Sequence, residues 1–349
     1  MKYSIIIPVY NRTDELNELL QSLESQEQKD FEVVVVDDGS THDCQSVANS
    51  HADKLNLRYF WKENGGPGPA RNFGAQQAQG ETLLILDSDC VLPPHYLTAV
   101  SAELSNTGTQ FFGGPDKAHP SFTPTQKAIS YAMTSFFTTG GLRGQRNSPC
   151  KFYPRSFNMG IERNLFHKLN GFSPMRFGED IDLSLRAEEA GYAGMLFPEA
   201  WVWHKRRTNL KKFFKQVFCS GMARINLWKR HPHSLKIVHL LPTMFTLGLA
   251  LLLLLLCVGV LICGFSANQA MASIGQALCL AALLPPLLFS LLIFFDAGFR
   301  SKSLKVGLLA VAASFVQLTG YGTGFLHAAW LRMVRGKGEV EAFKHNFYK

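Results

Sequence analysis

The segment LLILDSDC, residues 83–90, ends an apolar run with two carboxylates. Four consecutive apolar residues predict a strand that is buried on both faces. Asp87 and Asp89 follow with one residue between them, and side chains at i and i+2 of a strand point to the same side. Two carboxylates held this close repel each other, and a divalent cation with oxygen ligands would relieve the repulsion. The segment therefore predicts a site for a hard divalent cation, with a solvated strand end as the alternative.

Other polar clusters also follow apolar segments in the first 200 residues. Strands are predicted at residues 4–8, in FEVVVV at 31–36 and in LRYFW at 57–61, and a helix is predicted at 70–79. Continuous apolar strands that alternate with helices predict a mostly parallel sheet covered on both faces. In such sheets, ligands bind at the carboxyl ends of the strands. That edge would gather the clusters PVYNR at 8–12, VDDGS at 36–40 and ENGGPGPARNFG at 63–74.

The glycine-rich cluster contains Arg71, whose planar guanidinium carries a permanent charge. Its glycines allow the backbone to approach a ligand closely. Together with acids at the same edge, this favours a nucleotide site with a metal. No Gly-x-x-x-x-Gly-Lys-Ser/Thr pattern is present, and no Gly-x-Gly-x-x-Gly follows the first strand. A P-loop and a dinucleotide cofactor are therefore not expected.

A second acidic pair, Glu179 and Asp180, lies in GEDIDLSLR at 178–186. The apolar residues Ile181, Leu183 and Leu185 follow and predict that the pair begins a helix. Carboxylates are favoured at a helix N-terminus, so ordinary capping is the alternative to a functional role.

Taken together, these segments resemble the family 2 glycosyltransferases of GT-A fold. The matching segments follow the family's order over nearly all of residues 1–204: PVYNR at 8–12, VDDGS at 36–40, GGPGPARNFG at 65–74, LDSD at 86–89, NMGIERNLFHKLNGF at 158–172 and GEDIDLSLR at 178–186. The resemblance implies an α/β fold with a Rossmann-like, mostly parallel sheet flanked by helices. It also implies an inverting enzyme that moves a sugar from a nucleotide diphosphate donor to an acceptor hydroxyl.

The resemblance assigns roles residue by residue. Asp180 corresponds to the catalytic base. Asp89 corresponds to the direct ligand of Mg²⁺ or Mn²⁺, with Asp87 beside it. His204 matches a histidine that approaches the metal or diphosphate in many GT-A enzymes. A structural or surface role is the alternative for His204. The residues expected to bind the donor are Pro8, Tyr10, Asp38, Arg71, Asp87, Asn158, Gly160 and Glu179, with Tyr10 and Asp38 at the base and Asn158 and Gly160 near the sugar.

These roles agree with the chemistry of sugar transfer. Negative charge builds on the leaving phosphate, and a divalent ion takes up that charge as a Lewis acid. A separate carboxylate accepts the proton of the acceptor hydroxyl. In-line attack then inverts the anomeric centre without a protein nucleophile. Two alternatives stay open: a metal-dependent nucleotidyltransferase, and a non-enzymatic, membrane-anchored scaffold that binds nucleotides.

Composition changes abruptly near residue 239. Two long apolar segments, 239–265 and 271–295, each exceed the roughly 20 residues that a membrane-spanning helix needs. A third segment, 304–331, is less apolar, and a re-entrant or surface-lying helix is its alternative. The expected organisation is a catalytic domain at 1–205, a basic amphipathic interfacial helix at 206–235, about three transmembrane helices at 236–332, and a basic tail at 333–349.

Lys and Arg predict the orientation of the spans. The segments KRRTNLKKFFK and DAGFRSKSLK are basic and are expected in the cytoplasm, whereas the SANQA link contains neither Lys nor Arg. Three crossings are favoured, although they place the basic C-terminal tail outside. The start of the chain does not resemble a signal peptide, so a multi-pass cell-membrane protein with a cytoplasmic catalytic domain is expected.

The partners follow from this arrangement. Residues 208–232 predict a basic amphipathic helix on an anionic membrane surface, with a packed helix as the alternative. A nucleotide-sugar donor is expected, with a UDP-sugar favoured over GDP and dTDP sugars, and a lipid or saccharide acceptor. Nucleic acid is not expected despite the net charge of +8, because the basic residues adjoin the apolar spans. The loop at 141–155 is expected to shape the donor or acceptor pocket, and the sequence does not predict the oligomeric state.

Overall fold

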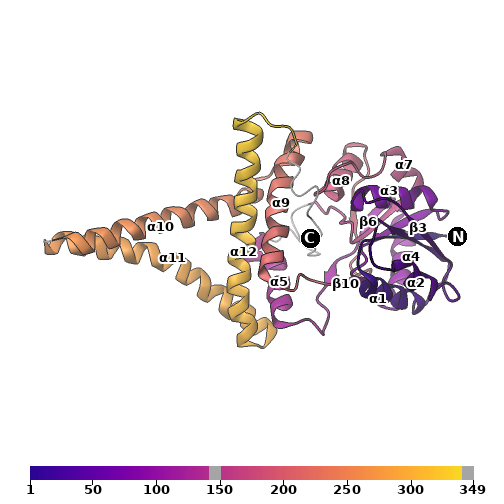
Figure 1. Cartoon of the computed structure of the whole chain (residues 1–349), viewed down its shortest axis with the longest axis horizontal. Helices are drawn as coiled ribbons and strands as arrows, with labels where there is room; N and C mark the ends of the chain where they lie inside the picture. The colour runs from indigo at the N-terminus through magenta and orange to yellow at the C-terminus, as the bar shows by residue number, and fades with distance from the viewer. Residues whose placement is uncertain (141–150, 267, 340–349) are drawn as a thin grey trace. The chain divides into compact units, whose positions relative to one another are not determined.

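The computed structural model describes residues 1–140, 151–266 and 268–339, and these divide into two compact units (Figure 1). The sheet unit contains the described residues of 1–120 and 151–205, and the helical unit contains the described residues of 121–140 and 206–339. The predicted catalytic domain ended at residue 205 but also included 121–140, a segment that the structure groups with the helices. The first ten residues of the predicted pocket loop, 141–150, lie outside the described residues.

Seven strands form the main sheet within the described part of the chain, in the order β3-β2-β1-β4-β8-β6-β9. Strands β1 to β4 are parallel to one another, β8 is antiparallel to both β4 and β6, and β9 is parallel to β6. A smaller sheet has the order β5-β10-β7. The strands are β1 (Tyr3–Val9), β2 (Phe31–Asp37), β3 (Leu57–Trp61), β4 (Thr82–Leu86), β5 (Cys90–Val91), β6 (Phe111–Gly113), β7 (Asp116–Lys117), β8 (Asn158–Glu162), β9 (Met195–Leu196) and β10 (Val202–His204). The predicted mostly parallel α/β sheet is confirmed.

Both faces of the central strands are buried, as their continuous apolar sequences predict. In β1, Ile5 and Ile7 belong to one core cluster, whereas Ile6 between them belongs to a second cluster on the opposite face. In β4, Leu84 and Ile85 divide between the two clusters in the same way. The alternation follows from the two-residue period of a strand. Polar side chains are therefore confined to the ends of these strands.

Helices flank the main sheet. The helices of the sheet unit are α1 (Thr13–Glu24), α2 (Cys44–Asn49), α3 (Pro67–Gln77), α4 (Tyr96–Thr107), α7 (Arg163–Lys168) and α8 (Glu179–Glu189). Helix α3 begins three residues before the predicted start at Ala70, because Pro67 and Pro69 are tolerated in a first helical turn, where N–H groups have no intrahelical partner.

The helical unit consists of one short segment from the middle of the chain and a long C-terminal part. Its helices are α5 (Pro124–Thr134), α6 (Phe136–Thr139), α9 (Leu210–Arg230), α10 (Leu241–Phe265), α11 (Gln269–Ser301) and α12 (Leu304–Ala329), with 3-10 turns η1 (Pro232–Ser234) and η2 (Ile237–His239) and a π-helical turn η3 (Trp330–Val334). Among the described residues, three helices are long and apolar enough to cross a membrane: Leu241–Phe265, Gln269–Ser301 and Leu304–Val334.

The predicted interfacial helix corresponds to α9. Its basic residues include Lys211, Lys212, Lys229 and Arg230, which are exposed. Its apolar face packs against α12, and Phe213 and Val217 are buried in a core shared with α5, α11 and α12. The structure therefore covers the apolar face of α9 with protein.

Candidate active site

One buried arginine joins two of the predicted acidic clusters. Arg71, in α3, contacts the Asp87 carboxylate at 2.7 Å and the Glu179 carboxylate at 2.8 Å. Its guanidinium also lies 5.3 Å from the centre of the Phe172 ring. Burial lowers the pKa of Arg71, but the two carboxylates outweigh burial and raise it above its ordinary value. This ion-pair bridge holds the end of β4 next to the start of α8, although about 90 residues separate them in sequence.

The acidic pair at 179–180 begins α8, as predicted. Glu179 is buried and faces Arg71, whereas Asp180 lies 3.6 Å from a nitrogen of Arg155 and accepts a hydrogen bond from the Ile181 N–H. Burial raises the pKa of the Glu179 carboxyl to about 7, with Arg71 opposing this shift and Asp180 adding to it. The two neighbouring acids therefore have different surroundings: Glu179 is part of a buried bridge, and Asp180 is more accessible.

Asp89 has different partners from Asp87. One of its oxygens contacts Arg12, and the other lies 3.2 Å from His204 Nε2. His204 is in β10 opposite Cys90, and its ring stacks on Phe157 with 4.7 Å between ring centres. The Asp89 charge raises the pKa of the Arg12 guanidinium. The two carboxylates of the opening segment are thus each matched by an arginine, Asp87 by Arg71 and Asp89 by Arg12.

The surroundings of Asp89 fit a divalent cation. Ligand atoms of Asp89, Cys90 and His204 lie within 4.8 Å of one another. His204 Nδ1 is buried and has no hydrogen-bond partner among the described residues. A carboxylate and an imidazole suit Mn²⁺ or Mg²⁺, whereas burial raises the pKa of the Cys90 thiol and keeps it protonated, which makes it a poor ligand for a hard ion. Asp87, which faces Arg71, is not part of this cluster.

The predicted base-binding residues lie at the ends of β1 and β2. Pro8 is within β1, in register with Val36 of β2, and Tyr10 follows β1. The Asp38 carboxylate pairs with Lys62 at 2.8 Å and accepts hydrogen bonds from the N–H groups of Gly65 and Gly66. Asp38 therefore holds the glycine-rich loop that leads into α3 and Arg71.

Asn158 and Gly160 are within β8, inside the sheet. The Asn158 side chain accepts a hydrogen bond from the Tyr96 hydroxyl and donates one to the Ala200 carbonyl. Gly160 lies opposite Phe112, and a Cβ at this position would be 2.0 Å from the Phe112 ring. Packing and backbone support explain both residue types, and their part in donor binding stays a prediction.

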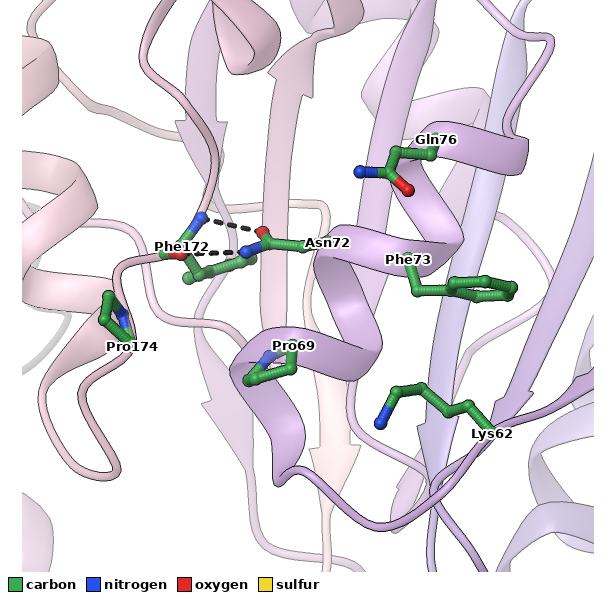
Figure 2. A pocket seen from close by; sticks show the side chains of 7 residues that line it. All are labelled: Lys62, Pro69, Asn72, Phe73, Gln76, Phe172 and Pro174. Atoms are coloured by element: carbon green, nitrogen blue, oxygen red, sulfur yellow. Dashed lines mark hydrogen bonds between the residues drawn. The ribbon is translucent and has the colours of Figure 1, made fainter.

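A cavity of about 370 Å³ lies at the outer side of α3 (Figure 2). Its lining residues are Lys62, Pro69, Asn72, Phe73, Gln76, Phe172 and Pro174. Figure 2 shows the Asn72 amide bonded to the backbone N–H and carbonyl of Phe172. Asp89, Asp180 and His204 do not line it. This cavity adjoins the Arg71 bridge through Phe172 and is distinct from the Asp89 and Asp180 positions.

The sequence analysis named no individual role for three basic residues: Arg12, Lys62 and Arg155. Each contacts a predicted acidic site residue. A signal existed for Arg12, since it ends the PVYNR cluster and β1 lies beside β4 in a parallel sheet. Nothing in the sequence pattern singled out Lys62, whereas Arg155 ends the 141–155 loop that was expected to shape the donor or acceptor pocket.

Comparisons with known proteins indicate an enzyme family and a fold. The glycosyl transferase family 2 model matches residues 4–173. Glycosyltransferase AglE of Haloferax volcanii is 26% identical over 251 residues, which is 70% of this chain and 80% of AglE. The poly(ribitol-phosphate) β-N-acetylglucosaminyltransferase TarS of Staphylococcus aureus is 45% identical over 93 residues, or 26% of this chain. That match covers only 16% of TarS, and a match to an uncharacterized glycosyltransferase of Rickettsia felis covers 15% of that protein.

A solved structure has the same fold. The mannosyltransferase PcManGT from Pyrobaculum calidifontis, in complex with GDP-Man and Mn²⁺, aligns with a TM-score of 0.57 and 18% identity. The alignment covers 90% of this chain and 86% of PcManGT. The segment that matches the glycosyl transferase family 2 model, residues 4–173, thus lies mostly in the sheet unit, and this unit has the GT-A fold.

Proposed function

We propose that this chain is a membrane-bound, inverting glycosyltransferase. It moves a sugar from a nucleotide diphosphate sugar, with a UDP-sugar as the first candidate, to a hydroxyl of a lipid or lipid-linked saccharide in cell-envelope glycan or glycolipid synthesis. The family 2 domain supports the reaction class. The apolar helices 241–265 and 269–301 support attachment to a membrane.

The observation that carries the proposal is the Arg71 bridge. By pairing with both Asp87 and Glu179, Arg71 holds the strand end before Asp89 next to the helix that begins with Asp180. Sugar transfer needs positive charge where the phosphate leaves and a base on the other side of the anomeric carbon. One rigid, buried ion-pair bridge that links the two acidic segments is a suitable support for both.

Each residue has a part in this proposal. Tyr10 and Asp38 hold the base end of the donor from the ends of β1 and β2, with Pro8 near the end of β1. Asn158, Gly160 and Glu179 support the sugar end. Asp180 accepts the proton of the acceptor hydroxyl, because it is the more accessible acid of its pair and has one oxygen on the Arg155 side. Arg12 balances the charge of Asp89 in the absence of donor.

A divalent cation, Mg²⁺ or Mn²⁺, would be held by Asp89 and His204, and it would supply a Lewis acid for the departing diphosphate. Asp87 pairs with Arg71 and lies outside this ligand cluster, so its part in holding the cation stays a prediction. The Mn²⁺ in the PcManGT complex belongs to a protein with the same fold and supports testing this ion first.

The membrane arrangement is part of the proposal. Basic residues near the ends of α9 and α11 support a multi-pass protein of the cell membrane whose sheet unit faces the cytoplasm. An acceptor anchored in the cytoplasmic leaflet then lies at the same surface as the enzyme.

Product analysis tests the reaction. Purified full-length protein in detergent is incubated with UDP-sugars, dTDP-sugars and GDP-mannose in the presence of Mn²⁺. We expect release of a nucleoside diphosphate from one of these donors. Release of pyrophosphate from a nucleotide substrate would favour the nucleotidyltransferase alternative, and absence of any turnover or donor hydrolysis across the panel would favour the scaffold.

A further inference from the structure

Burial separates the three long apolar helices into two classes. In α10 only Thr243 and Gly259 are buried among the described residues, and in α11 only Gly275, Ala282, Ile293 and Ala297. Helix α12 instead has buried residues along its whole length, from Val306 to Ala328. Long exposed stretches of leucine in α10 and α11 suit contact with lipid tails, whereas α12 is covered along one side by protein.

Helices α10 and α11 form a hairpin that is narrow at one end. Near the turn their backbones touch, since a Cβ on Gly259 would be 2.8 Å from the Gly275 carbonyl oxygen. At the other end both helices contact α12, but at different levels. Gly307 faces the Phe294 carbonyl of α11, and Gly322 faces Pro242 and Thr246 of α10.

The two contact levels show how α12 runs. Fifteen residues of helix separate Gly307 from Gly322, or about 22 Å at 1.5 Å per residue, more than twice the usual distance between packed helix axes. Helix α12 therefore runs across the open end of the hairpin, from α11 to α10 (Figure 1). Phe315 fills the space between these levels and meets Phe245 of α10 and Phe289 of α11.

Helix α9 accompanies α12 along its length. A Cβ on Gly221 of α9 would be 2.1 Å from the Tyr321 carbonyl, and a Cβ on Gly324 would be 2.0 Å from the Phe218 carbonyl. Farther along, Arg332 donates a hydrogen bond to the Asn226 side chain at 3.0 Å. A crossing α12 would take its partner α9 into the bilayer as well.

That partner is unsuited to the bilayer interior. Helix α9 carries Lys or Arg at 211, 212, 215, 224, 229 and 230, so its longest stretch without a positive charge is 216–223, much shorter than a membrane span. Charged side chains in the hydrocarbon region are costly and rare. Both ends of α12 are also basic: Lys302 and Lys305 lie at its start, and Arg335 and Lys337 follow its end. Basic residues at both ends place both ends on the cytoplasmic side.

The uncovered side of α12 fits a lipid surface. Leu304, Leu308 and Trp330 are exposed at helical spacing. Thr319 and Thr323 on the same side donate their hydroxyl hydrogen bonds to backbone carbonyls of their own helix, so they need no other partner. Apolar residues with basic ends and a terminal tryptophan are typical of a helix that lies in the membrane interface.

We infer that α12 lies along the cytoplasmic surface of the membrane and does not cross it. The hairpin of α10 and α11 provides the two spans of the described chain, and α12 with α9 closes its cytoplasmic end. Lys337 then lies in the cytoplasm. This inference rests on the membrane attachment proposed above and does not depend on the transfer reaction.

Cysteine labelling tests this topology independently of activity. Gln269→Cys, Lys305→Cys and Lys337→Cys are introduced singly into the full chain at exposed positions, with the unsubstituted chain as baseline. Intact cells are treated with a membrane-impermeant maleimide, and permeabilised cells serve as the reference. We expect Gln269→Cys to react in intact cells, and Lys305→Cys and Lys337→Cys to react only after permeabilisation.

The contrary results are distinct. Reaction of Lys337→Cys in intact cells would mean that α12 crosses, and lack of reaction of Gln269→Cys in intact cells would mean that the hairpin does not. Either outcome overturns the inference while leaving a soluble-donor assay unaffected.

A charge substitution gives a second readout. Ala312 in α12 and Leu254 in α10 are both exposed. A lysine at the membrane surface can extend its amine to water, whereas a lysine in the middle of a span cannot do so easily. We expect Ala312→Lys to change the amount of membrane-integrated protein by less than about twofold and Leu254→Lys to lower it by about tenfold or more. Equal losses would contradict a surface position for α12.

Discussion

The two units of this chain differ in where they place charged residues. The sheet unit buries charged groups and pairs them, as in the Arg71 contacts with Asp87 and Glu179. The helical unit exposes large apolar residues such as Leu251, Leu254 and Leu288, and it keeps Lys and Arg near the ends of its helices. Buried charges in the sheet unit must be paired, because burying an unpaired charge costs free energy. The exposed leucines of the helical unit suit contact with lipid tails instead of water.

The largest expected effect is at Asp89, where the sheet unit concentrates its charge. Asp89→Asn removes the carboxylate that faces Arg12 and His204, and we expect turnover to fall about a thousandfold, because a cation at this position is worth several kcal/mol in the transition state. Electron paramagnetic resonance of Mn²⁺ should show weaker ion binding. The exposed Asp53→Asn serves as control, and equal Mn²⁺ binding by Asp89→Asn would remove this residue from the metal site.

Substitution of Arg71 tests whether the buried ion pairs of the sheet unit stabilise it. Arg71→Met leaves Asp87 and Glu179 without their shared counter-charge, and we expect a loss of about 3 kcal/mol in the free energy of unfolding. Lys54, 67% exposed in its pair with Glu24, is the matched control. Lys54→Met should cost less than about 0.5 kcal/mol. Similar losses for both variants, measured by thermal unfolding in detergent, would show that the bridge does not support the site.

The glycines of the helical unit test its packing. Gly221→Val inserts a side chain where even a Cβ would clash with the Tyr321 carbonyl. We expect the free energy of unfolding to fall by about 2 kcal/mol. Gly248, in α10, is the matched control, because a Cβ added there would meet nothing within 4 Å. Gly248→Val should have little effect on unfolding. If the two variants unfold alike, α9 and α12 are not in close contact.

The smallest expected effect concerns pH. The unfolded Glu179 carboxyl titrates near 4.5 and the folded one near 7, so between these values only the folded state keeps the proton. Stability must then decrease as pH rises from about 4.5 to 7. Glu179→Gln should remove up to about 1 kcal/mol per pH unit of this decrease. Melting temperatures across this range check it, with the exposed Glu199→Gln as control; an unchanged slope for Glu179→Gln would contradict the shift.

Much of the sheet unit could be predicted from the sequence, because apolar strands and polar strand ends are local patterns. The strands around Ile6, Val35 and Leu84 and the helix that begins at Glu179 follow directly from such patterns. The pairing of Asp89 with Arg12 could not be read locally, since it depends on β1 and β4 being neighbours. The position of Gly160 under Phe112 depends on strand register in the same way.

The helical unit was harder to predict because hydropathy does not distinguish its helices well. The three apolar helices share a composition signal, yet α12 has buried residues along its length, whereas only Thr243 and Gly259 of α10 are buried among the described residues. The contact of α5 with α11 could not be predicted from the sequence either. The Tyr131 hydroxyl donates a hydrogen bond of 2.6 Å to Asp296, a residue 165 positions later in the chain. Both features depend on tertiary contacts between distant segments.

The most direct test of sugar transfer by this site is a comparison of turnover and donor binding in Asp180→Asn. Purified full-length protein is assayed for nucleoside diphosphate release with its donor and acceptor, and donor affinity is measured separately by calorimetry. We expect turnover to fall by about a hundredfold or more, with donor affinity nearly unchanged. Near-normal turnover in Asp180→Asn with intact donor binding would contradict it.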